Sequence, residues 1–538
     1  MTVHPRNVVV VGGGVAGIAA AIELSKNPNV HVTLLEARDR LGGRIVTRRN
    51  FISPDLESSG LVPPGTSELA FDFGASWIHG VDPSNPLYAL VKAGHVEYVH
   101  TDTDLMFFAP SQPALPTEES NYYWKVVWDL LDEAQAYATE HRHQIPEDMS
   151  FLEWLNQYLD AKQSDDSNED NYMSERLKQA VRGLSMYWAD ENAIPLEKVS
   201  MKYMDAEEIF PGEHSLVHNG FDRVVKVLVD QLKDVTVLLD HVVNRIEYDD
   251  TEVRVSTSKG SFTADQVLVT LPLGVLKAHS EALFSPPLPA TKQRAIQHLG
   301  FGTMYKILLF FPTCFWPDDV HFINFLPSKL TREPHPHLVA RFNLNDRQLE
   351  ALAVYMQDLA NYSSLMPVYN KPILIGYATN RAAELMERLS DEEARMVYMC
   401  QLAHYYDILI SDKEGEGEAL WPKVSFMSRW NQDPFAYGSY SSIPVGATPA
   451  DIKTFETPVG VRLLSSVERG GNSNNDGTTV VDGADKWTST DDPSSGRVFF
   501  AGEHTSSGHF ASIQGALISG RREAAMLLGQ LDNHGNKV

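Results

Sequence analysis

The chain opens on an apolar, β-branched run that is followed by a small, apolar helical stretch. Val8–Val11 are four consecutive apolar positions that glycines end, a pattern that predicts a buried strand. The next segment, residues 15–26, predicts a helix, and HVTLLEA at 31–37 predicts a second strand. A strand, a helix and a second strand in this order predict the first unit of a parallel α/β sheet.

The rest of the chain alternates between helical and strand-like patterns. Helical periodicity recurs in three segments, at 123–160, 174–189 and 380–408. Short strand-like runs occupy three others, at 235–276, 305–311 and 338–344. Three segments rich in Gly, Ser, Asn and Asp lack the apolar residues of a core, at 163–171, 412–418 and 469–496. These polar segments predict solvated surface loops.

The turn between the first strand and its helix has the spacing of a dinucleotide-binding site. Gly12 allows a tight turn, Gly14 lets the backbone approach a pyrophosphate, and Gly17 packs the helix against the strand. Glu36, at the end of the second strand, can accept from ribose hydroxyls, and an acid at this place disfavours a 2′-phosphate. The residues therefore predict a bound dinucleotide and leave FAD and NAD open.

The composition of the chain limits the functions and partners that it can have. The chain has 538 residues, 43% of them hydrophobic, which is enough for at least two domains. Its net charge of −26 disfavours nucleic acid and anionic membranes as partners and favours cationic ligands. Two cysteines, Cys314 and Cys400, cannot form a disulfide framework and suit a reducing compartment. The sequence contains no zinc-binding pattern, so we expect no metal site.

Targeting signals are not evident. The first strand follows directly on a short polar segment, with no signal peptide before it, and no apolar run has the length of a membrane span. The C-terminus is not of the S-K-L type. We expect a soluble, cytoplasmic protein without a membrane partner, and a peroxisomal location stays open.

Further motifs, in order along nearly the whole chain, resemble the flavin-containing amine oxidases of the polyamine oxidase type. They are ARDRLGGR after Glu36, FDFGASWIHG at 71–80, DHVVNRIEY at 240–248, LGFGTMYKILLFF at 299–311, SRWNQDPFAYGSYSSIPVGA at 428–447, and RVFFAGEHTSSGHFASIQGALISG from 497. The resemblance selects FAD over NAD. It also implies that the FAD is non-covalent, because Ser439 stands where monoamine oxidases carry the cysteine that bonds to flavin.

The resemblance implies an α/β fold with a Rossmann-like FAD-binding domain of the glutathione-reductase/amine-oxidase type. An α+β substrate-binding domain would be interleaved with it along the chain. We expect the FAD-binding domain to comprise 1–80, 215–275 and 495–538, and the substrate-binding domain to comprise 81–214 and 276–494.

The resemblance also assigns roles to substrate-side residues. Lys306 would reach the reactive flavin nitrogen through a water, and His79 would face the substrate amine. Trp430 and Tyr440 would line the cavity in front of the flavin, and Ser512 would contact substrate. Without the motifs, Lys306 would be a strand lysine that reaches solvent and His79 a structural histidine.

Four more residues would complete the cofactor site. Arg44 would lie along the pyrophosphate, Val243 would contact adenine, and Glu503 would accept from the ribityl hydroxyls. Ile513 would open a helix whose amides face the flavin pyrimidine carbonyl. Gln514 departs from the histidine that is usual in this motif.

The implied reaction is the oxidation of spermine, spermidine or their acetylated derivatives. A hydride would pass to flavin, the imine would hydrolyse to an aldehyde and a shorter amine, and oxygen would reoxidise the flavin with release of hydrogen peroxide. The alternatives are an L-amino-acid oxidase or another amine oxidase of the family and, from a different class, a non-catalytic flavin-binding protein. The sequence does not indicate the oligomeric state.

Overall fold

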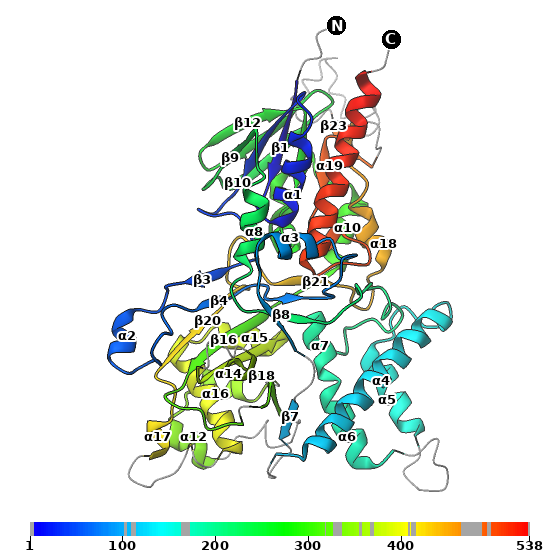
Figure 1. Ribbon diagram of the computed structural model, residues 1–538. Helices are drawn as coiled ribbons and strands as arrows, with labels where there is room; N and C mark the ends of the chain where they lie inside the picture. Colours follow the sequence, from blue (N-terminus) through cyan, green and yellow to red (C-terminus); the bar gives the residue numbers. More distant parts are fainter. Residues whose placement is uncertain are drawn as a thin grey trace, which may run out of the picture.

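The predicted first strands pair in a five-stranded parallel sheet, seen in the upper part of Figure 1. Its strands, in spatial order, are β24 (Val498–Phe500), β13 (Gln266–Val269), β1 (Arg6–Val11), β2 (Val30–Leu35) and β9 (Val235–Leu238). They come from the three separate segments expected to form the FAD-binding domain. The parallel sheet confirms the α/β fold, and the domain boundaries stay a prediction.

Helices α1 (Val15–Ser25) and α19 (Ile513–Gly535) pack side by side against this sheet (Figure 1). Small residues allow the close approach, because a Cβ on Gly520 of α19 would lie 2.2 Å from the carbonyl oxygen of Ala16. Nearly every side chain of α1 is buried, which its run of Ala, Val and Ile explains. The packing brings two helix N-termini to the same edge of the sheet.

A second, four-stranded sheet flanks the first. It contains β12 (Gly260–Ala264), β11 (Val253–Thr257), β10 (Val243–Tyr248) and β14 (Phe284–Ser285). This sheet, with β9 and β13, confirms the succession of short strands predicted for 235–276. The short helices α8 (Asp222–Val229), α9 (Leu273–Leu283), α10 (Ala290–His298) and α18 (Pro449–Thr454) surround these two sheets.

A six-stranded sheet forms the lower left of Figure 1. Its strands, in spatial order, are β20 (Val424–Met427), β16 (Met304–Phe310), β19 (Ile373–Thr379), β18 (Asp358–Asn361), β17 (Phe322–Phe325) and β7 (Leu105–Phe108). The helices beside it are α12 (Pro336–Phe342), α13 (Asp346–Leu352), α14 (Tyr362–Leu365), α15 (Asn380–Glu387), α16 (Asp391–Tyr405) and α17 (Glu416–Ala419). Ser390 caps α16 in a capping box with Glu393, which divides the predicted helical segment 380–408 in two.

A helical group forms the lower right of Figure 1. It consists of α4 (Thr117–His141), α5 (Phe151–Ala161), α6 (Glu175–Leu184) and α7 (Met186–Asn192), as the periodicity of 123–160 and 174–189 predicted. Short elements join the parts: α2 (Pro54–Ser58), α3 (Tyr88–Ala93), β3 (Thr47–Arg49), β4 (Ala70–Asp72), β5 (Trp77–Ile78), β6 (Tyr98–His100), β8 (Ser215–Val217), β15 (Gly300–Gly302), β21 (Tyr440–Ser442) and η5 (Glu503–Thr505).

Three local predictions were wrong, wholly or in part. Residues 338–344 were expected to form a strand, but α12 occupies most of them, because Leu338 and Phe342 lie one helical turn apart and both enter the core beside α16. The polar segment 469–496 contains a strand, β23 (Trp487–Thr490), which pairs with β22 (Gly460–Leu463). In the polar segment 412–418, α17 begins at Glu416.

The computed structural model describes residues 5–535, apart from 102–104, 109–113, 163–172, 318, 326–335, 355–357, 366–370, 407–408, 410–415, 464–486 and 492–495. The predicted loop at 163–171 and the first parts of the two other polar segments lie outside the described residues. Within the described ranges, no helix is both long and apolar enough to cross a membrane.

Candidate active site

A cavity of about 980 Å³ joins the edge of the parallel sheet to the six-stranded sheet and the helical group. Of the predicted site residues, all except Gly17 line this cavity. The structure therefore brings together side chains that are spread over most of the chain. Gly17 lies beneath the lining, where a Cβ would come within 1.9 Å of the carbonyl oxygen of Gly12.

The glycine turn after β1 leaves room for a ligand rather than for protein. Gly12 has a φ of +106°, and a Cβ at this residue would meet the Thr270 hydroxyl oxygen at 2.6 Å. A Cβ on Gly14, by contrast, would meet no protein atom within 4 Å. The amides of the first turn of α1 have no intrahelical acceptor and face this open space. The turn fits a pyrophosphate, as the spacing predicted.

Glu36, 6% exposed, closes one side of the turn. Its two carboxylate oxygens accept from the amides of Gly13 at 2.7 Å and Arg38 at 2.8 Å. The backbone thus holds the carboxylate in place, and each oxygen keeps a lone pair. This geometry fits an acceptor for ribose hydroxyls.

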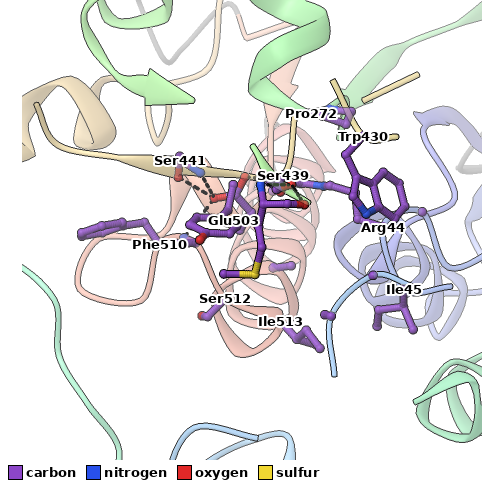
Figure 2. A pocket seen from close by; sticks show the side chains of 18 of the residues that line it. Arg44, Ile45, Pro272, Trp430, Ser439, Ser441, Glu503, Phe510, Ser512 and Ile513 are labelled. Atoms are coloured by element: carbon purple, nitrogen blue, oxygen red, sulfur yellow. Dashed lines mark hydrogen bonds and ion pairs between the residues drawn. The ribbon is translucent and has the colours of Figure 1, made fainter. Parts of the chain in front are cut away.

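Glu503 and Arg44 form a buried ion pair (Figure 2). The Arg44 guanidinium donates to Glu503 at 2.9 Å and to the carbonyl oxygen of Ser439 at 2.6 Å. Ser441 and the amide of Ala511 also donate to Glu503. Burial alone would raise the pKa of Glu503, but Arg44 and these donors outweigh it, and the pKa lies below its ordinary value. The carboxylate is ionised, and contact with ribityl hydroxyls stays a prediction.

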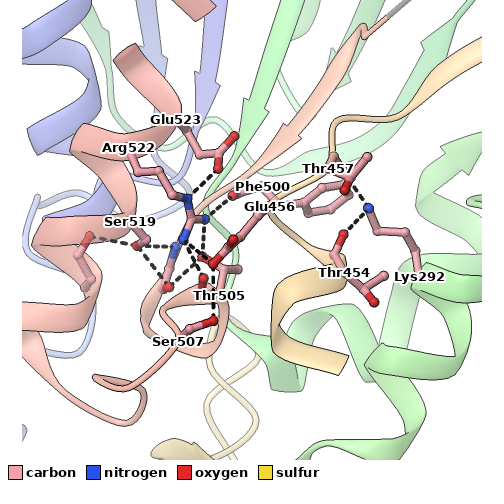
Figure 3. A network of polar contacts seen from close by, with 12 residues as sticks. Lys292, Thr454, Glu456, Thr457, Phe500, Thr505, Ser507, Ser519, Arg522 and Glu523 are labelled. Carbon is pink, nitrogen blue, oxygen red and sulfur yellow. Dashed lines mark hydrogen bonds and ion pairs between the residues drawn. The ribbon is translucent and has the colours of Figure 1, made fainter. Parts of the chain in front are cut away.

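A polar network around Arg522 and Thr505 holds η5, the turn that also carries Glu503 (Figure 3). Arg522 of α19 donates to the carbonyl oxygen of Thr505 at 2.7 Å and forms an ion pair with the fully buried Glu523 at 2.8 Å. The same guanidinium contacts Glu456 at 3.4 Å. Since Thr505 belongs to η5 with Glu503, Arg522 ties the position of Glu503 to α19.

The predicted helix start at Ile513 is confirmed. Ser512 precedes it and caps it, because its hydroxyl accepts from the Gly515 amide at 3.0 Å and donates to the His509 carbonyl oxygen at 2.7 Å. The structure therefore gives Ser512 a capping role, and its contact with substrate stays a prediction. In the described part of the chain, no acceptor contacts the amides of Ile513 and Gln514, which can serve a flavin carbonyl.

Lys306 lies in β16 and is only 6% exposed, so it does not reach solvent. Its ammonium group donates to the carbonyl oxygen of Gly74 at 2.6 Å and to the Ser76 hydroxyl at 2.7 Å. Burial lowers the pKa of Lys306 to about 8, although the charge of Asp72 opposes this shift. A buried lysine that titrates near neutral pH can hold or release a proton at the cavity wall.

His79 faces a second histidine that the sequence analysis did not single out. The Nδ1 atoms of His79 and His214 lie 2.9 Å apart, so one ring donates and the other accepts a single proton. Burial lowers the pKa of His79 to about 4, and the imidazole is neutral at neutral pH. Asn85 fixes the backbone of His79 by donating to its carbonyl oxygen at 3.0 Å.

The predicted aromatic wall is present, and its polar atoms are satisfied by the protein. The Trp430 indole donates to the carbonyl oxygen of Phe73 at 3.0 Å, and the Tyr440 hydroxyl donates to that of Asp190 at 2.7 Å. Burial raises the pKa of Tyr440 well above its ordinary value. These rings therefore offer their faces, not their polar atoms, to the cavity. The hydroxyl of Ser439 accepts from the Met304 amide.

Sequence reasoning missed five carboxylates in the cavity wall: Asp132, Asp190, Glu191, Glu207 and Glu208. Burial raises the pKa of Asp190 to about 7 and that of Glu207 to about 8, where Glu191 adds to the shift. Within the described ranges, no lysine or arginine forms an ion pair with Asp190, Glu191 or Glu207. The adjacent acids in the segments YWADEN and DAEEIF were the available sequence signal for these carboxylates. Without the fold, such acids are interpreted as solvent-exposed surface residues.

Comparison with known proteins agrees with this geometry. The family model described as "Flavin containing amine oxidoreductase" matches residues 15–528. The chain is 31% identical to rice "Polyamine oxidase 5" over 85% of this chain and 81% of the relative. It is 29% identical to Arabidopsis thaliana "Lysine-specific histone demethylase 1 homolog 1" over 98% of this chain and 52% of the relative.

Among solved structures, putrescine oxidase bound to putrescine has the same fold. The TM-score is 0.61 at 18% sequence identity, over 98% of this chain and 99% of the other. At this identity the similarity concerns the fold, and it confirms the architecture expected from the motifs.

Proposed function

This chain belongs to the flavin-containing amine oxidoreductase family, and from that premise we propose that it oxidises polyamines. FAD is the cofactor, and when bound it supplies an acceptor for the hydride that leaves the substrate carbon. Gly14, Glu36 and the first turns of α1 and α19 would hold it. The remaining chemistry belongs to the cavity wall.

The observation that carries the proposal is a group of three carboxylates in the cavity wall, Asp190, Glu191 and Glu207. Asp190 is half-buried, Glu191 and Glu207 are exposed to the cavity, and no lysine or arginine of the described residues compensates their charge. A substrate with several ammonium groups would supply the compensation. Diamines, triamines and tetramines have this property, and simple monoamines have only one such group.

The reacting nitrogen must be neutral, although alkylamines are protonated at pH 7. A nitrogen beside the buried Trp430 ring loses part of its hydration, and this desolvation disfavours its charged form. The neutral His79 can accept a hydrogen bond from it at Nε2 in the tautomer whose Nδ1 proton is donated to His214. The wall thus favours a neutral nitrogen beside Trp430 and positive charge beside Tyr440, on which Asp190, Glu191 and Glu207 act.

The cations of the cavity wall argue against an L-amino-acid oxidase. Such an enzyme needs an arginine for the substrate carboxylate, and the arginines in the described lining are Arg38 and Arg44. Arg38 pairs with Asp433 at 2.9 Å, and Arg44 pairs with Glu503. Both lie on the cofactor side. A non-catalytic role fits poorly as well, because it does not explain why a lysine, Lys306, is buried in the cavity wall.

A peroxide assay of the purified protein tests the proposal. Spermine, spermidine, acetylspermine and putrescine are compared with benzylamine and L-leucine, and we expect peroxide from at least one polyamine and little from L-leucine. Reduction by L-leucine with none by any polyamine would overturn the proposal.

Because Ser439 cannot form a thioether, acid precipitation should release the flavin into the supernatant, and flavin in the pellet would contradict non-covalent binding.

A further inference from the structure

Large apolar side chains are exposed at the outer end of the cavity. Trp128 is 38% exposed and Ile209 is 58% exposed, and both line the cavity. Trp128 is not part of the hydrophobic core of the helical group, although it lies on the same helix, α4, as several core residues. An exposed tryptophan at the mouth of a cavity indicates a role in ligand binding rather than in packing.

Trp128 is one side of an aromatic corner. The rings of Trp124 and Trp128 lie 5.8 Å apart at 86°, and those of Trp124 and Tyr187 lie 5.2 Å apart at 81°. Trp128 and Tyr187 complete the set at 5.9 Å and 61°. The three rings thus pack edge to face on one another, and all three line the cavity.

Each helix that carries these rings also carries a carboxylate of the cavity wall. The Tyr187 hydroxyl donates to the carboxylate of Glu191 on the next turn of α7, which ties one ring to the acids of the cavity wall. Asp132 follows Trp128 by one turn of α4 and lines the same part of the cavity. Electron-rich ring faces next to carboxylates are the chemistry that recognises an alkylammonium cation.

We propose that Trp124, Trp128 and Tyr187 form an outer subsite that binds the distal ammonium group of a long polyamine. The proposal rests on the proposed function and deepens it, since a tetramine would occupy this subsite while its other end reaches the inner aromatic wall. We expect a short diamine held at the inner end to leave this subsite empty. The subsite therefore selects by chain length.

The first test uses decamethonium, which carries two quaternary ammonium groups on a ten-carbon chain and cannot form an imine. Its binding to the holoenzyme is measured by calorimetry. Trp128→Ala should raise the Kd by roughly 2- to 30-fold, the range for one cation–π contact. The matched control is Tyr122→Ala, because Tyr122 is 53% exposed on the same helix and does not line the cavity. Trp128→Phe should recover part of the affinity.

The second test compares spermine with putrescine in steady-state assays. Trp128→Ala should raise the KM for spermine by a similar factor while the KM for putrescine and the FAD content stay at the wild-type level. Equal decamethonium affinity in wild type, Trp124→Ala and Trp128→Ala would overturn the subsite. If decamethonium binding depends on Trp128 while no polyamine is oxidised, the subsite stands and the proposed function fails.

Discussion

The carboxylates on the two sides of the cavity have opposite surroundings. On the cofactor side, Glu36 accepts from two backbone amides, and Glu503 pairs with Arg44, which keeps its pKa below the ordinary value. On the substrate side, burial raises the pKa of Asp190 and Glu207, and the described residues offer them no lysine or arginine. On the cofactor side, protein groups compensate each carboxylate. On the substrate side, the described residues supply no lysine or arginine as a counter-charge.

This difference separates a permanent ligand from a transient one. A cofactor that stays bound gains from groups that are already held in place, because little order has to be created on binding. A substrate that must enter and leave can instead bring the charge that the site lacks. The carboxylates on the substrate side, which no lysine or arginine of the described residues pairs, then give specificity for cations.

The largest effect should come from disturbing the cofactor side at its closest contact. Gly17→Val would place side-chain atoms against the Gly12 carbonyl oxygen and destabilise the protein by about 3 kcal/mol or more. Gly14→Ala is the matched variant, because its Cβ meets no protein atom and its backbone is extended. It should fold as the wild type but bind FAD roughly 5- to 150-fold more weakly, since the methyl group occupies the ligand's space. Thermal unfolding of the apoprotein and flavin titration separate the two, and unchanged FAD affinity in Gly14→Ala would place the pyrophosphate elsewhere.

A smaller effect on activity is expected at Lys306, where the cofactor side and the substrate side of the cavity meet. Lys306→Met keeps the length of the side chain and removes its proton-holding group, so amine oxidation or flavin reoxidation should slow by ~10–100-fold. FAD content should stay near the wild-type level, because the cofactor anchors lie elsewhere. Stopped-flow measurement of both half-reactions checks this. If neither rate changes, Lys306 is structural.

The substrate side can be tested by removing one charge. Glu207→Gln should raise the KM for the preferred polyamine about tenfold, the loss of one charge-assisted contact, while it stabilises the free enzyme. Burial and then Glu191 raise the pKa of Glu207 from 4.5 to about 8. Between these values the folded protein holds a proton that the unfolded chain has lost, so wild-type stability falls as pH rises through this window.

Melting temperatures at pH 5 and pH 8 measure this dependence. The stability advantage of Glu207→Gln over the wild type should grow as pH rises between them. Glu208→Gln is the neighbouring control, because the Glu208 side chain is 77% exposed. A pH-independent difference would mean that Glu207 is already ionised or already compensated in the free enzyme.

The cofactor side could be predicted from the sequence because its determinants are local. Gly12, Gly14 and Glu36 lie within one strand–helix–strand unit, where spacing fixes geometry. Lys306 and Trp430 were found through motifs with a family resemblance, and the structure places both in the cavity wall. The partners of Glu503 could not be predicted, since Arg44 and Ser441 approach it from distant segments.

The substrate side depends on contacts that no local pattern encodes. Glu191 and Glu207 come from two segments that only the fold brings together, and each reads as a surface acid in the sequence. The aromatic corner has the same origin, because Tyr187 reaches Trp124 from another helix. The strand prediction for residues 338–344 was wrong for a different reason, because a short apolar run fits a strand and a buried helix equally well.

The smallest effect should come from the Tyr440 hydroxyl. It donates to the carbonyl oxygen of Asp190 and leaves the ring face to the cavity. Tyr440→Phe should therefore cost about 1 kcal/mol of stability and change kcat/KM for a polyamine by less than about fivefold. Tyr440→Ala removes the ring as well and should lower kcat/KM much further, because the wall no longer excludes water. Thermal unfolding and steady-state assays compare the pair. A loss in Tyr440→Phe as large as in Tyr440→Ala would show that the hydroxyl, through the position of Asp190, matters more than the aromatic face.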